Sequence, residues 1–376
     1  MLRSPVRPRV AYWNNIPAPY VVDRFNAVAR RAHVDLEAWF SFRTERGRSW
    51  SVDEARWEFP HRWLPCAGPF PFPSPLVSRR PPDLLVSLYG WPWFAAGFVL
   101  AKARRTRIAF ECEVTSKRRL ERTGWKEAAK RTLFPRLDAV LTMGEEGERY
   151  ASAYGADPAR FVRVTHSIGA VHFSAEADAA RARRDAVRAE LGVDGAAFLY
   201  VGRLLSEKGL DGLLDAYAGL RRSGAGAALV LVGDGEDDER LRRRVGQEAI
   251  PGVVFAGFRE GLDLVALYGA CDAFVLPTLG EPWGLVVEEA MASGLPVVAS
   301  SAAGEIRARV RDGETGYIVP PEEPERLRAA MERLLQPELR ARFGAAALDS
   351  VVDRTPEAWA ERFEHAVERI MSMPPR

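Results

Sequence analysis

The sequence has few of the residues that build disulfide frameworks or thiolate metal sites. Only three cysteines occur among 376 residues. Cys66, Cys112 and Cys271 lie far apart, show no metal-ligand spacing and cannot all pair with one another. This usage fits a reducing cytosol. We therefore expect three structural thiols in a cytoplasmic protein.

Two common nucleotide-site motifs are also missing. No GxxxxGK[ST] run occurs, which excludes a P-loop ATPase. In LVLVGDGEDDERL, residues 229–241, no third glycine follows Gly233 and Gly235 where a dinucleotide turn requires it, so we expect no nicotinamide or flavin cofactor. The acidic residues of this run suit a helix start better than a metal site, because acids there favour the helix dipole.

The chain also lacks a strong net charge and an uninterrupted membrane-spanning run. A formal net charge of +2 rules out a strongly electrostatic global role, and no nucleic-acid-binding module accompanies the basic residues. Residues 84–101 carry no charge, but Gly90 and Pro92 interrupt them, which predicts strand, turn and helix. We expect no transmembrane helix, no secretory signal and no nucleic-acid partner.

Apolar strand-like runs alternate with helical patterns along the whole chain, which predicts an α/β fold with parallel sheets covered by helices on both faces. The runs form two series, residues 9–13, 34–40, 83–90, 107–114 and 137–144, then 197–203, 228–235, 253–258, 272–278, 296–300 and 316–320. An Ala- and Arg-rich segment, residues 173–193, separates the series. The Pro-rich residues 65–75 are predicted to lack regular structure.

These patterns predict two Rossmann-like domains. We expect an N-terminal domain of residues 1–180 and a C-terminal domain of residues 181–354. Ligands of such sheets bind outside the carboxyl ends of the strands, so the expected site is a cleft between the two domains.

The run GEPWGLVVEEAMASGLPVVAS, residues 280–300, places two carboxylates around a predicted helix start. Pro282 suits a first-turn position, Gly284 lacks Cβ bulk, and a helix of roughly ten residues would leave its first amides unpaired. Glu289 falls on a face expected to look inward, and Glu281 precedes the helix. Two acids around free amides suit a ligand with hydroxyls at both ends and anionic oxygens between them, as in a nucleotide sugar. The alternative is a capping glutamate and a solvated one.

The run YVGRLLSEKGLDGLLDAY, residues 200–217, places a cation pair in a strand-to-helix loop. Gly202 ends the strand, and Arg203 and Lys208 follow it. Fixed cations at such an edge stabilise the charge that develops on a departing diphosphate. The alternative is a surface loop with solvated cations.

The two runs resemble the GRLxxEKG motif and the EPFGL…EA signature of the family-four retaining glycosyltransferases, also called glycosyl transferases group 1. The resemblance extends over nearly the whole chain, but its specific motifs lie in the C-terminal half. It implies a GT-B fold, in which two Rossmann-like domains face each other across a cleft, with a C-terminal helix at about 355–372 crossing back to the N-terminal domain. It also implies a metal-independent transfer from a nucleotide sugar, without a cofactor.

The resemblance assigns roles to residues of both runs. Arg203, Lys208 and the amides at Gly284 and Leu285 would hold the diphosphate, Glu289 the ribose, and Glu281 the sugar hydroxyls. Among these, Glu281, Arg203 and Lys208 are the catalytic candidates. Family members hold the nucleobase near the loop that contains Phe258 here, although a plain strand end is an open alternative there. The remaining donor-binding candidates are Gly202, Pro282 and Trp283.

The N-terminal half resembles the family less specifically. Asn14 and Asn15 lie in a loop placed like the one that family members bring near the donor phosphates, or in a plain turn. Where relatives often carry a His near the donor sugar, this chain has Glu111 and Glu113, either of which could bind an acceptor hydroxyl. His166 lies at the expected domain junction and is a candidate ligand-binding residue.

A basic stretch spans residues 116–134, with seven cations between Lys117 and Arg131. As a helix it would show Leu120, Trp125 and Leu133 among cations. Such a helix can lie on an anionic membrane, as in relatives with lipid-linked acceptors. It can equally be a solvated face with Trp125 in the core.

Taken together, the sequence predicts a retaining glycosyltransferase, cytoplasmic or peripheral on the inner face of the membrane. Its acceptor would be a saccharide, a lipid-linked or a small-molecule hydroxyl, in the synthesis of bacterial cell-surface polysaccharide, glycolipid or glycosylated metabolites. Two alternatives stay open, a nucleotide-sugar 2-epimerase of the same fold and a non-catalytic nucleotide-sugar-binding subunit. The sequence does not identify the donor sugar, its base or the acceptor.

Overall fold

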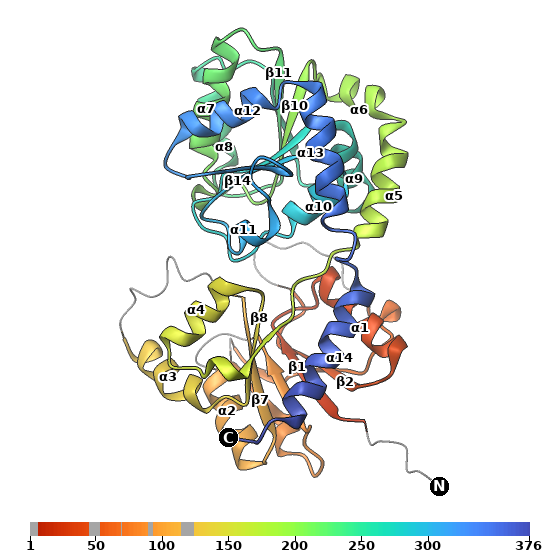
Figure 1. Ribbon diagram of the computed structural model, residues 1–376, viewed down its shortest axis with the longest axis vertical. Helices are drawn as coiled ribbons and strands as arrows, with labels where there is room; N and C mark the ends of the chain where they lie inside the picture. Colours follow the sequence, from red (N-terminus) through yellow and green to blue (C-terminus); the bar gives the residue numbers. More distant parts are fainter. Residues whose placement is uncertain (1–6, 45–52, 69, 89–92, 114–123) are drawn as a thin grey trace. The chain divides into compact units, whose positions relative to one another are not determined.

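The computed structural model describes residues 7–44, 53–68, 70–88, 93–113 and 124–376 (Figure 1). The chain divides into two compact units. Unit 1 contains residues 1–167 and 356–376, and unit 2 contains residues 168–355. The division therefore falls at residue 168, whereas the sequence places it at residue 181. Each unit has its own parallel sheet and its own hydrophobic core.

Unit 1 is built on a seven-stranded sheet in the order β3-β2-β1-β6-β7-β8-β9, with all neighbours parallel. The strands are β1 (Arg9–Asn14), β2 (Asp35–Phe40), β3 (His61–Trp63), β6 (Leu84–Ser87), β7 (Arg107–Cys112), β8 (Ala139–Thr142) and β9 (Phe161–Arg163). The α-helices are α1 (Pro19–Arg31), α2 (Trp93–Ala103), α3 (Trp125–Leu133), α4 (Glu145–Ala153) and α14 (Pro356–Ser372).

Alternate strand residues of unit 1 enter two separate cores, as the two-residue repeat of a strand requires. Val10 and Tyr12 belong to a core that includes residues of α1 and α14, whereas Ala11 and Trp13 belong to one with residues of α2 and α4. Because both faces are covered, the central strands are mostly apolar, with Asn14 and Glu111 among the buried exceptions. Helices α1 and α14 lie side by side (Figure 1), so residues from the two ends of the chain close one face of the same sheet.

Specific contacts anchor α14 to unit 1. Trp359 is fully buried and stacks on Phe363, with ring centroids 5.0 Å apart. At the other end, Arg107 donates hydrogen bonds of 2.5 and 2.6 Å to the carbonyls of Ile370 and Met373. A cation at a helix C-terminus satisfies free carbonyls and complements the helix dipole.

Unit 2 has a six-stranded parallel sheet in the order β12-β11-β10-β13-β14-β15. Its strands are β10 (Ala196–Val201), β11 (Ala227–Val232), β12 (Val253–Gly257), β13 (Ala273–Leu276), β14 (Val297–Ser300) and β15 (Gly316–Val319). Its α-helices are α5 (Ala170–Arg181), α6 (Arg184–Leu191), α7 (Leu210–Arg222), α8 (Asp238–Gln247), α9 (Gly261–Ala270), α10 (Val286–Ala292), α11 (Ile306–Arg309), α12 (Pro324–Arg333) and α13 (Pro337–Asp349).

The structure also differs from the sequence prediction in small elements. Strands β3 and β9 were not predicted, because each has only three residues. The Pro-rich segment 65–75, predicted to be irregular, contains a two-residue antiparallel pair, β4 (Cys66–Ala67) with β5 (Phe70–Pro71), and the start of the 3-10 helix Ser74–Val77. Further 3-10 helices are Glu54–Arg56, Phe134–Arg136, Pro158–Arg160 and Ser206–Lys208. The expected separating segment 173–193 belongs to unit 2, where α5 packs on α9.

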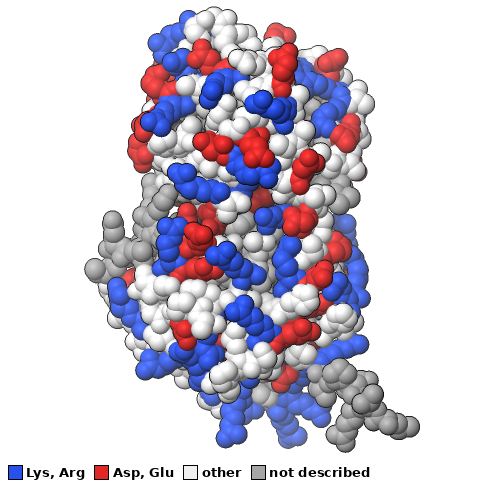
Figure 2. Space-filling model, viewed as in Figure 1, with Lys and Arg blue, Asp and Glu red and all other residues white. Residues whose placement is uncertain are grey.

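Two global features bear on possible partners. Among the described residues, no helix combines the length and the apolar character needed to cross a bilayer. On the face drawn in Figure 2, basic and acidic side chains are interspersed over both units. This mixture agrees with the formal net charge of +2.

Candidate functional site

The predicted donor-binding residues of unit 2 gather at a topological switch point. From β10 the chain proceeds to β11 and β12 on one side, and then from β13 to β14 and β15 on the other. In open α/β sheets, ligands bind beside the carboxyl ends of the strands at such a point. The loop after β10 carries Gly202, Arg203 and Lys208, and the loop after β13 carries residues 281–285.

Hydrogen bonds to one backbone carbonyl hold these two loops together. Leu279 N donates to Glu207 O at 2.9 Å, and Thr278 Oγ1 donates to the same carbonyl at 3.3 Å. Gly209 has φ +71°, and a Cβ atom there would lie 2.1 Å from the carbonyl oxygen of Pro277. Only glycine permits this approach, because it has no Cβ atom and adopts positive φ readily.

The loop contacts bring Lys208 and Glu281 into a direct ion pair. Lys208 is 8% exposed, so most of this cation is shielded from water. Arg203 is more open, with its Nη2 atom 3.6 Å from Glu207 Oε1 and nearly half of its side chain exposed. Among the predicted catalytic candidates, Lys208 and Glu281 thus form a shielded ion pair. Arg203, in the same loop as Lys208, has an accessible guanidinium.

The helix after this loop is shorter than predicted. Helix α10 begins at Val286, so Pro282 and Gly284 precede it, and the prediction of Pro282 in its first turn is wrong. Gly284 instead makes a turn with φ +79°, which a residue with a side chain rarely adopts. Pro282 is exposed and Leu285 is partly exposed. The ring of Trp283 is buried, so it packs into unit 2 instead of facing solvent.

Glu289 was predicted on an inward face, and its carboxyl has lost hydration, although Glu288 on the same helix is the more deeply buried residue. Glu288 is buried, with 3% exposure, whereas Glu289 is partly exposed. Glu289 accepts a hydrogen bond of 3.0 Å from the Tyr268 hydroxyl. Loss of hydration raises the pKa of the Glu289 carboxyl to about 7, although the bond from Tyr268 acts in the opposite direction.

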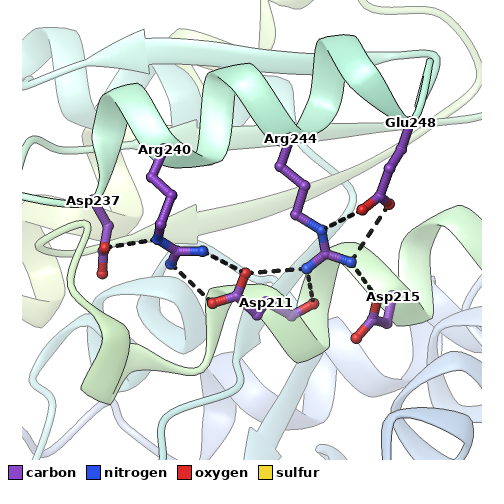
Figure 3. A network of polar contacts seen from close by, with 6 residues as sticks. All are labelled: Asp211, Asp215, Asp237, Arg240, Arg244 and Glu248. Carbon is purple, nitrogen blue, oxygen red and sulfur yellow. Dashed lines mark hydrogen bonds and ion pairs between the residues drawn. The ribbon is translucent and has the colours of Figure 1, made fainter.

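The acidic loop at the start of α8 is paired with arginines (Figure 3). Asp237 accepts from Arg240 at 2.9 Å, and Arg240 also binds both carboxylate oxygens of Asp211 at 2.8 Å. The network continues through Arg244, which binds Asp211, Asp215 and Glu248. The partners of the aspartates in this network are therefore arginines. Within the described residues, no group of three or more His, Cys, Asp or Glu side chains could hold a metal ion.

Phe258 follows β12 and is 41% exposed. In the strand order, β12 lies on one side of β10, and β13, which leads into residues 281–285, lies on the other. A large exposed apolar ring at a sheet edge is available for contact with a planar group. Its role at the nucleobase stays a prediction.

In unit 1, the predicted residues separate into buried and accessible groups. Asn14 ends β1 and is 3% exposed, and Asn15 follows it with a buried side-chain oxygen that has no hydrogen-bond partner. Glu111 lies on β7, 2% exposed, and accepts a hydrogen bond from the Tyr12 hydroxyl. Burial, with the nearby Glu113 charge, raises the pKa of Glu111 to about 8. A carboxyl so deeply buried cannot meet an acceptor hydroxyl in this conformation, contrary to the prediction.

Glu113 and His166 lie together at the end of unit 1. His166 Nε2 lies 2.9 Å from Glu113 Oε1, and Arg24 contacts His166 Nδ1 from the other side. Arg24 Nε also donates to Ser167 Oγ at 3.0 Å. His166 is 4% exposed, whereas about a fifth of the Glu113 side chain is open to solvent. Of the two glutamates, Glu113 is therefore the accessible one.

The basic stretch is only partly described. Four of its cations, Lys117, Arg118, Arg119 and Arg122, and Leu120 lie outside the described residues. In α3, Trp125 is 62% exposed, so the alternative of a core-facing Trp125 is wrong. Lys130 is buried, 3.0 Å from Glu127 Oε1 and 5.1 Å from the ring centre of Tyr154. Lys126 and Arg131 are exposed.

Sequence reasoning missed several polar residues in both units. Arg309 and Glu288 form a buried ion pair beneath the loop of residues 281–285, and Tyr12 and Arg24 contact the polar group of unit 1. Tyr12 and Arg24 stand inside ordinary strand and helix patterns. For Glu288, the only available signal was a charged residue in mainly apolar company, whereas Arg309 lies among other charged residues and gave no signal.

Part of unit 2 matches a known family. Residues 184–349 match the model of the family described as glycosyl transferases group 1. Curated relatives include a D-inositol 3-phosphate glycosyltransferase of Acidothermus cellulolyticus, 34% identical over 62% of this chain and 56% of its own length. A GDP-mannose-dependent alpha-mannosyltransferase of Mycobacterium tuberculosis is 40% identical over 46% of this chain and 43% of its own length. The chain thus spans about half the length of these relatives.

Solved structures resemble the chain over nearly its full length. Alr3699/HepE of Anabaena, in complex with UDP and glucose, aligns with 98% of this chain and 100% of its own, at a TM-score of 0.74 and 16% identity. Sucrose-phosphate synthase of Thermosynechococcus elongatus aligns with 97% of this chain and 100% of its own, at a TM-score of 0.77 and 20% identity. At these identities the likeness establishes the fold. Residues 184–349 therefore belong to the glycosyl transferases group 1 family, and the chain has a GT-B-like fold of two Rossmann-like units.

Proposed function

We propose that this protein is a retaining glycosyltransferase that moves a sugar from a nucleotide sugar to an acceptor hydroxyl. One observation carries the proposal. The loops after β10 and β13 bring Lys208 and Glu281 together, with Arg203 in the same loop, at the switch point of a sheet inside the segment that matches the family. Cations at that edge suit a diphosphate, and a carboxylate beside them suits sugar hydroxyls.

The catalytic proposal rests on charge. When the sugar bond breaks, the leaving nucleoside diphosphate gains negative charge, which Arg203 and Lys208 stabilise. Glu281 holds the Lys208 ammonium in place before the donor arrives, so little reorganisation is needed. The acceptor attacks from the face that the diphosphate leaves, and a phosphate oxygen takes its proton. The anomeric configuration is then retained.

Donor binding is proposed to extend to both sides of this pair. Glu289 would accept hydrogen bonds from the ribose hydroxyls. It would keep the hydrogen bond that it already accepts from Tyr268. Phe258 is proposed to contact the nucleobase, because its ring is exposed beside the same sheet edge. One relative is named for a GDP-linked sugar, and one structural neighbour contains UDP, so both bases are candidates.

The acceptor is proposed to meet unit 1 through Glu113 and His166. Glu113 is the accessible carboxylate of that unit, and His166 holds it from behind. The acceptor class is a saccharide, a lipid-linked or a small-molecule hydroxyl. For a lipid-linked acceptor, the exposed Trp125 and Lys126 would lie against an anionic bilayer, which sedimentation with neutral and anionic vesicles would detect.

A donor screen tests the proposal first. Purified protein is heated with UDP-, GDP-, ADP- and dTDP-linked sugars, and a donor present at about 100 times its Kd should stabilise the protein by roughly 2.7 kcal/mol. If none of these donors stabilises the protein, the proposed donor site is refuted.

Turnover then separates the three candidate activities. A transferase releases nucleoside diphosphate only when an acceptor extract is present, and NMR of its product should show the donor's anomeric configuration. An epimerase converts the donor without an acceptor, and a binding subunit releases nothing. Either of these two results would refute the proposed transferase activity.

A further inference from the structure

A buried ion pair lies directly beneath the proposed donor loop. Arg309 ends α11 and Glu288 lies on α10, and Arg309 Nε is 2.9 Å from Glu288 Oε1. Both side chains are nearly inaccessible to solvent, at 2% and 4% exposure. Burial of two charges costs free energy, and apolar residues of similar volume are often at least as stable. The pair therefore calls for an explanation beyond folding.

The other nitrogens of Arg309 bind the backbone of the donor loop. Its guanidinium donates to the carbonyl oxygens of Trp283, of Gly284 at 3.0 Å and of Gly304 at 3.2 Å. It also lies 4.4 Å from the ring centre of Trp283. Two consecutive carbonyls of the turn at Gly284 are thus fixed by one planar side chain, which lysine could not reproduce.

A second contact ties the same loop to the segment that leads into α11. Gly304 N donates to Glu281 O at 2.8 Å, and Glu281 pairs with Ala303 in an isolated parallel bridge. Glu305, the next residue, has φ +50°, a conformation that costs free energy for a residue other than glycine. Such strain persists only where surrounding contacts enforce it, as Arg309 and Gly304 do here.

We infer that Arg309 is a positioning residue for the donor loop and that Glu288 is its counter-ion. The inference rests on the proposed function. Arg309 holds the turn at Gly284, and this turn sets the direction in which Glu281 meets Lys208. A misplacement of about 1 Å at reacting groups can cost a hundredfold in rate.

The decisive variants separate positioning from folding. Arg309→Leu or Glu288→Leu alone leaves one buried charge without its partner, so each should melt well below the parent. The double variant Glu288→Leu with Arg309→Leu removes both charges and should melt above either single variant. It still lacks the donors to Trp283 and Gly284, so its kcat should stay about a hundredfold below the parent, with the donor KM changed less than threefold.

The conservative variants refine the assignment. Arg309→Lys keeps a positive charge beside Glu288 but loses the planar fork, whereas Glu288→Gln keeps the guanidinium and its carbonyl contacts. Arg309→Lys should therefore lose more of kcat than Glu288→Gln. The reverse order would overturn the inference.

A matched control lies at the amino ends of the strands of the same sheet, opposite the ends that carry the donor loop. Asp272 precedes β13, accepts a bond of 2.8 Å from Ala197 N and pairs with Arg184 and Arg188. Asp272→Asn disturbs an ion-pair cluster of unit 2 without touching the donor loop. It should lower the melting temperature and leave kcat within a factor of two.

Amide hydrogen exchange gives a readout that needs no turnover. In the double variant, residues 281–286 should exchange faster than in the parent, while the loop at residues 258–261 should exchange at an unchanged rate. Unchanged exchange at 281–286, or a folded double variant with parental kcat, would overturn the positioning role. A parent that turns over no donor would instead refute the proposed function, and the exchange result would still decide the role of Arg309.

Discussion

Glu111 should make unit 1 less stable as the pH rises toward 8. Its carboxyl is buried, accepts one hydrogen bond from Tyr12, and has a second oxygen without a hydrogen-bond partner. Burial raises the folded-state pKa of Glu111 from the ordinary 4.5 to about 8. The folded state therefore binds this proton more tightly than the unfolded state. The stabilisation is complete below about pH 4.5 and is lost as the pH rises through 8.

The magnitude follows from the size of the shift. One pKa unit corresponds to about 1.4 kcal/mol, so between pH 5 and 7 this group should lower the unfolding free energy by about 1.4 kcal/mol per pH unit. The full loss is on the order of 5 kcal/mol for the shift from 4.5 to about 8. Glu111→Gln is neutral at every pH and can still accept from Tyr12, so its stability should change less steeply with pH.

Urea unfolding at pH 5, 6 and 7, followed by tryptophan fluorescence, measures this difference. All tryptophans except Trp283 belong to unit 1, so the signal reports on the unit that contains Glu111. Equal slopes of stability against pH for the parent and Glu111→Gln would refute the reasoning.

Glu148→Gln is the control for this experiment. The hydrogen bond from Arg163 lowers the pKa of Glu148, which stabilises the folded state above the ordinary pKa of a glutamate. Removing the Glu148 charge should therefore lower stability at pH 7 and leave the slope between pH 6 and 7 unchanged.

The other predictions concern unit 2. Arg203→Ala or Lys208→Ala should lower kcat/KM by about 2.7 to 4 kcal/mol, roughly a hundred- to a thousandfold, and near-normal turnover in both would contradict their role at the diphosphate. Glu289→Ala should mainly raise the donor KM, because ribose contacts change little in the transition state, and a fall in kcat alone would contradict this. Gly209→Ala should lower the melting temperature, since its Cβ would lie 2.1 Å from a carbonyl oxygen, whereas Gly246→Ala, in open space within α8, should raise it slightly. EDTA should leave turnover unchanged, and a loss that one divalent ion restores would contradict metal-independent transfer.

The fold was largely predictable because parallel strands buried on both faces leave a strong pattern. All eleven predicted strand segments contain strands, and the run 84–101 contains β6 and α2, while the predicted turn at Gly90 and Pro92 lies outside the described residues. The short edge strands β3 and β9 were missed, since three residues carry too little periodicity. The start of α10 was also misjudged by several residues, because Pro282 satisfies the rules for a helix start while the turn at Gly284 overrides them.

The candidate site was predictable only where residues follow strand ends in one unit. Gly202, Lys208 and Glu281 converge because β10 and β13 are neighbours, and motif spacing was enough to place them. Glu111 and Glu113 could not be distinguished in this way. They are two residues apart, so a strand running through both would place them on one face, but β7 ends at Cys112, between the buried carboxyl and the accessible one.

Strand order also explains why the two units contribute different kinds of group. In unit 1 the switch point lies between β1 and β6, and Asn14 at the end of β1 is buried there, as are Tyr12 and Glu111, which share a hydrogen bond. In unit 2 the corresponding position holds the ion pair of Lys208 and Glu281. A diphosphate requires fixed charge, whereas an acceptor hydroxyl requires only hydrogen bonds. The ion pair at the switch point of unit 2 therefore supports the proposal that the donor binds there, which makes Arg203, Lys208 and Arg309 the first residues to vary.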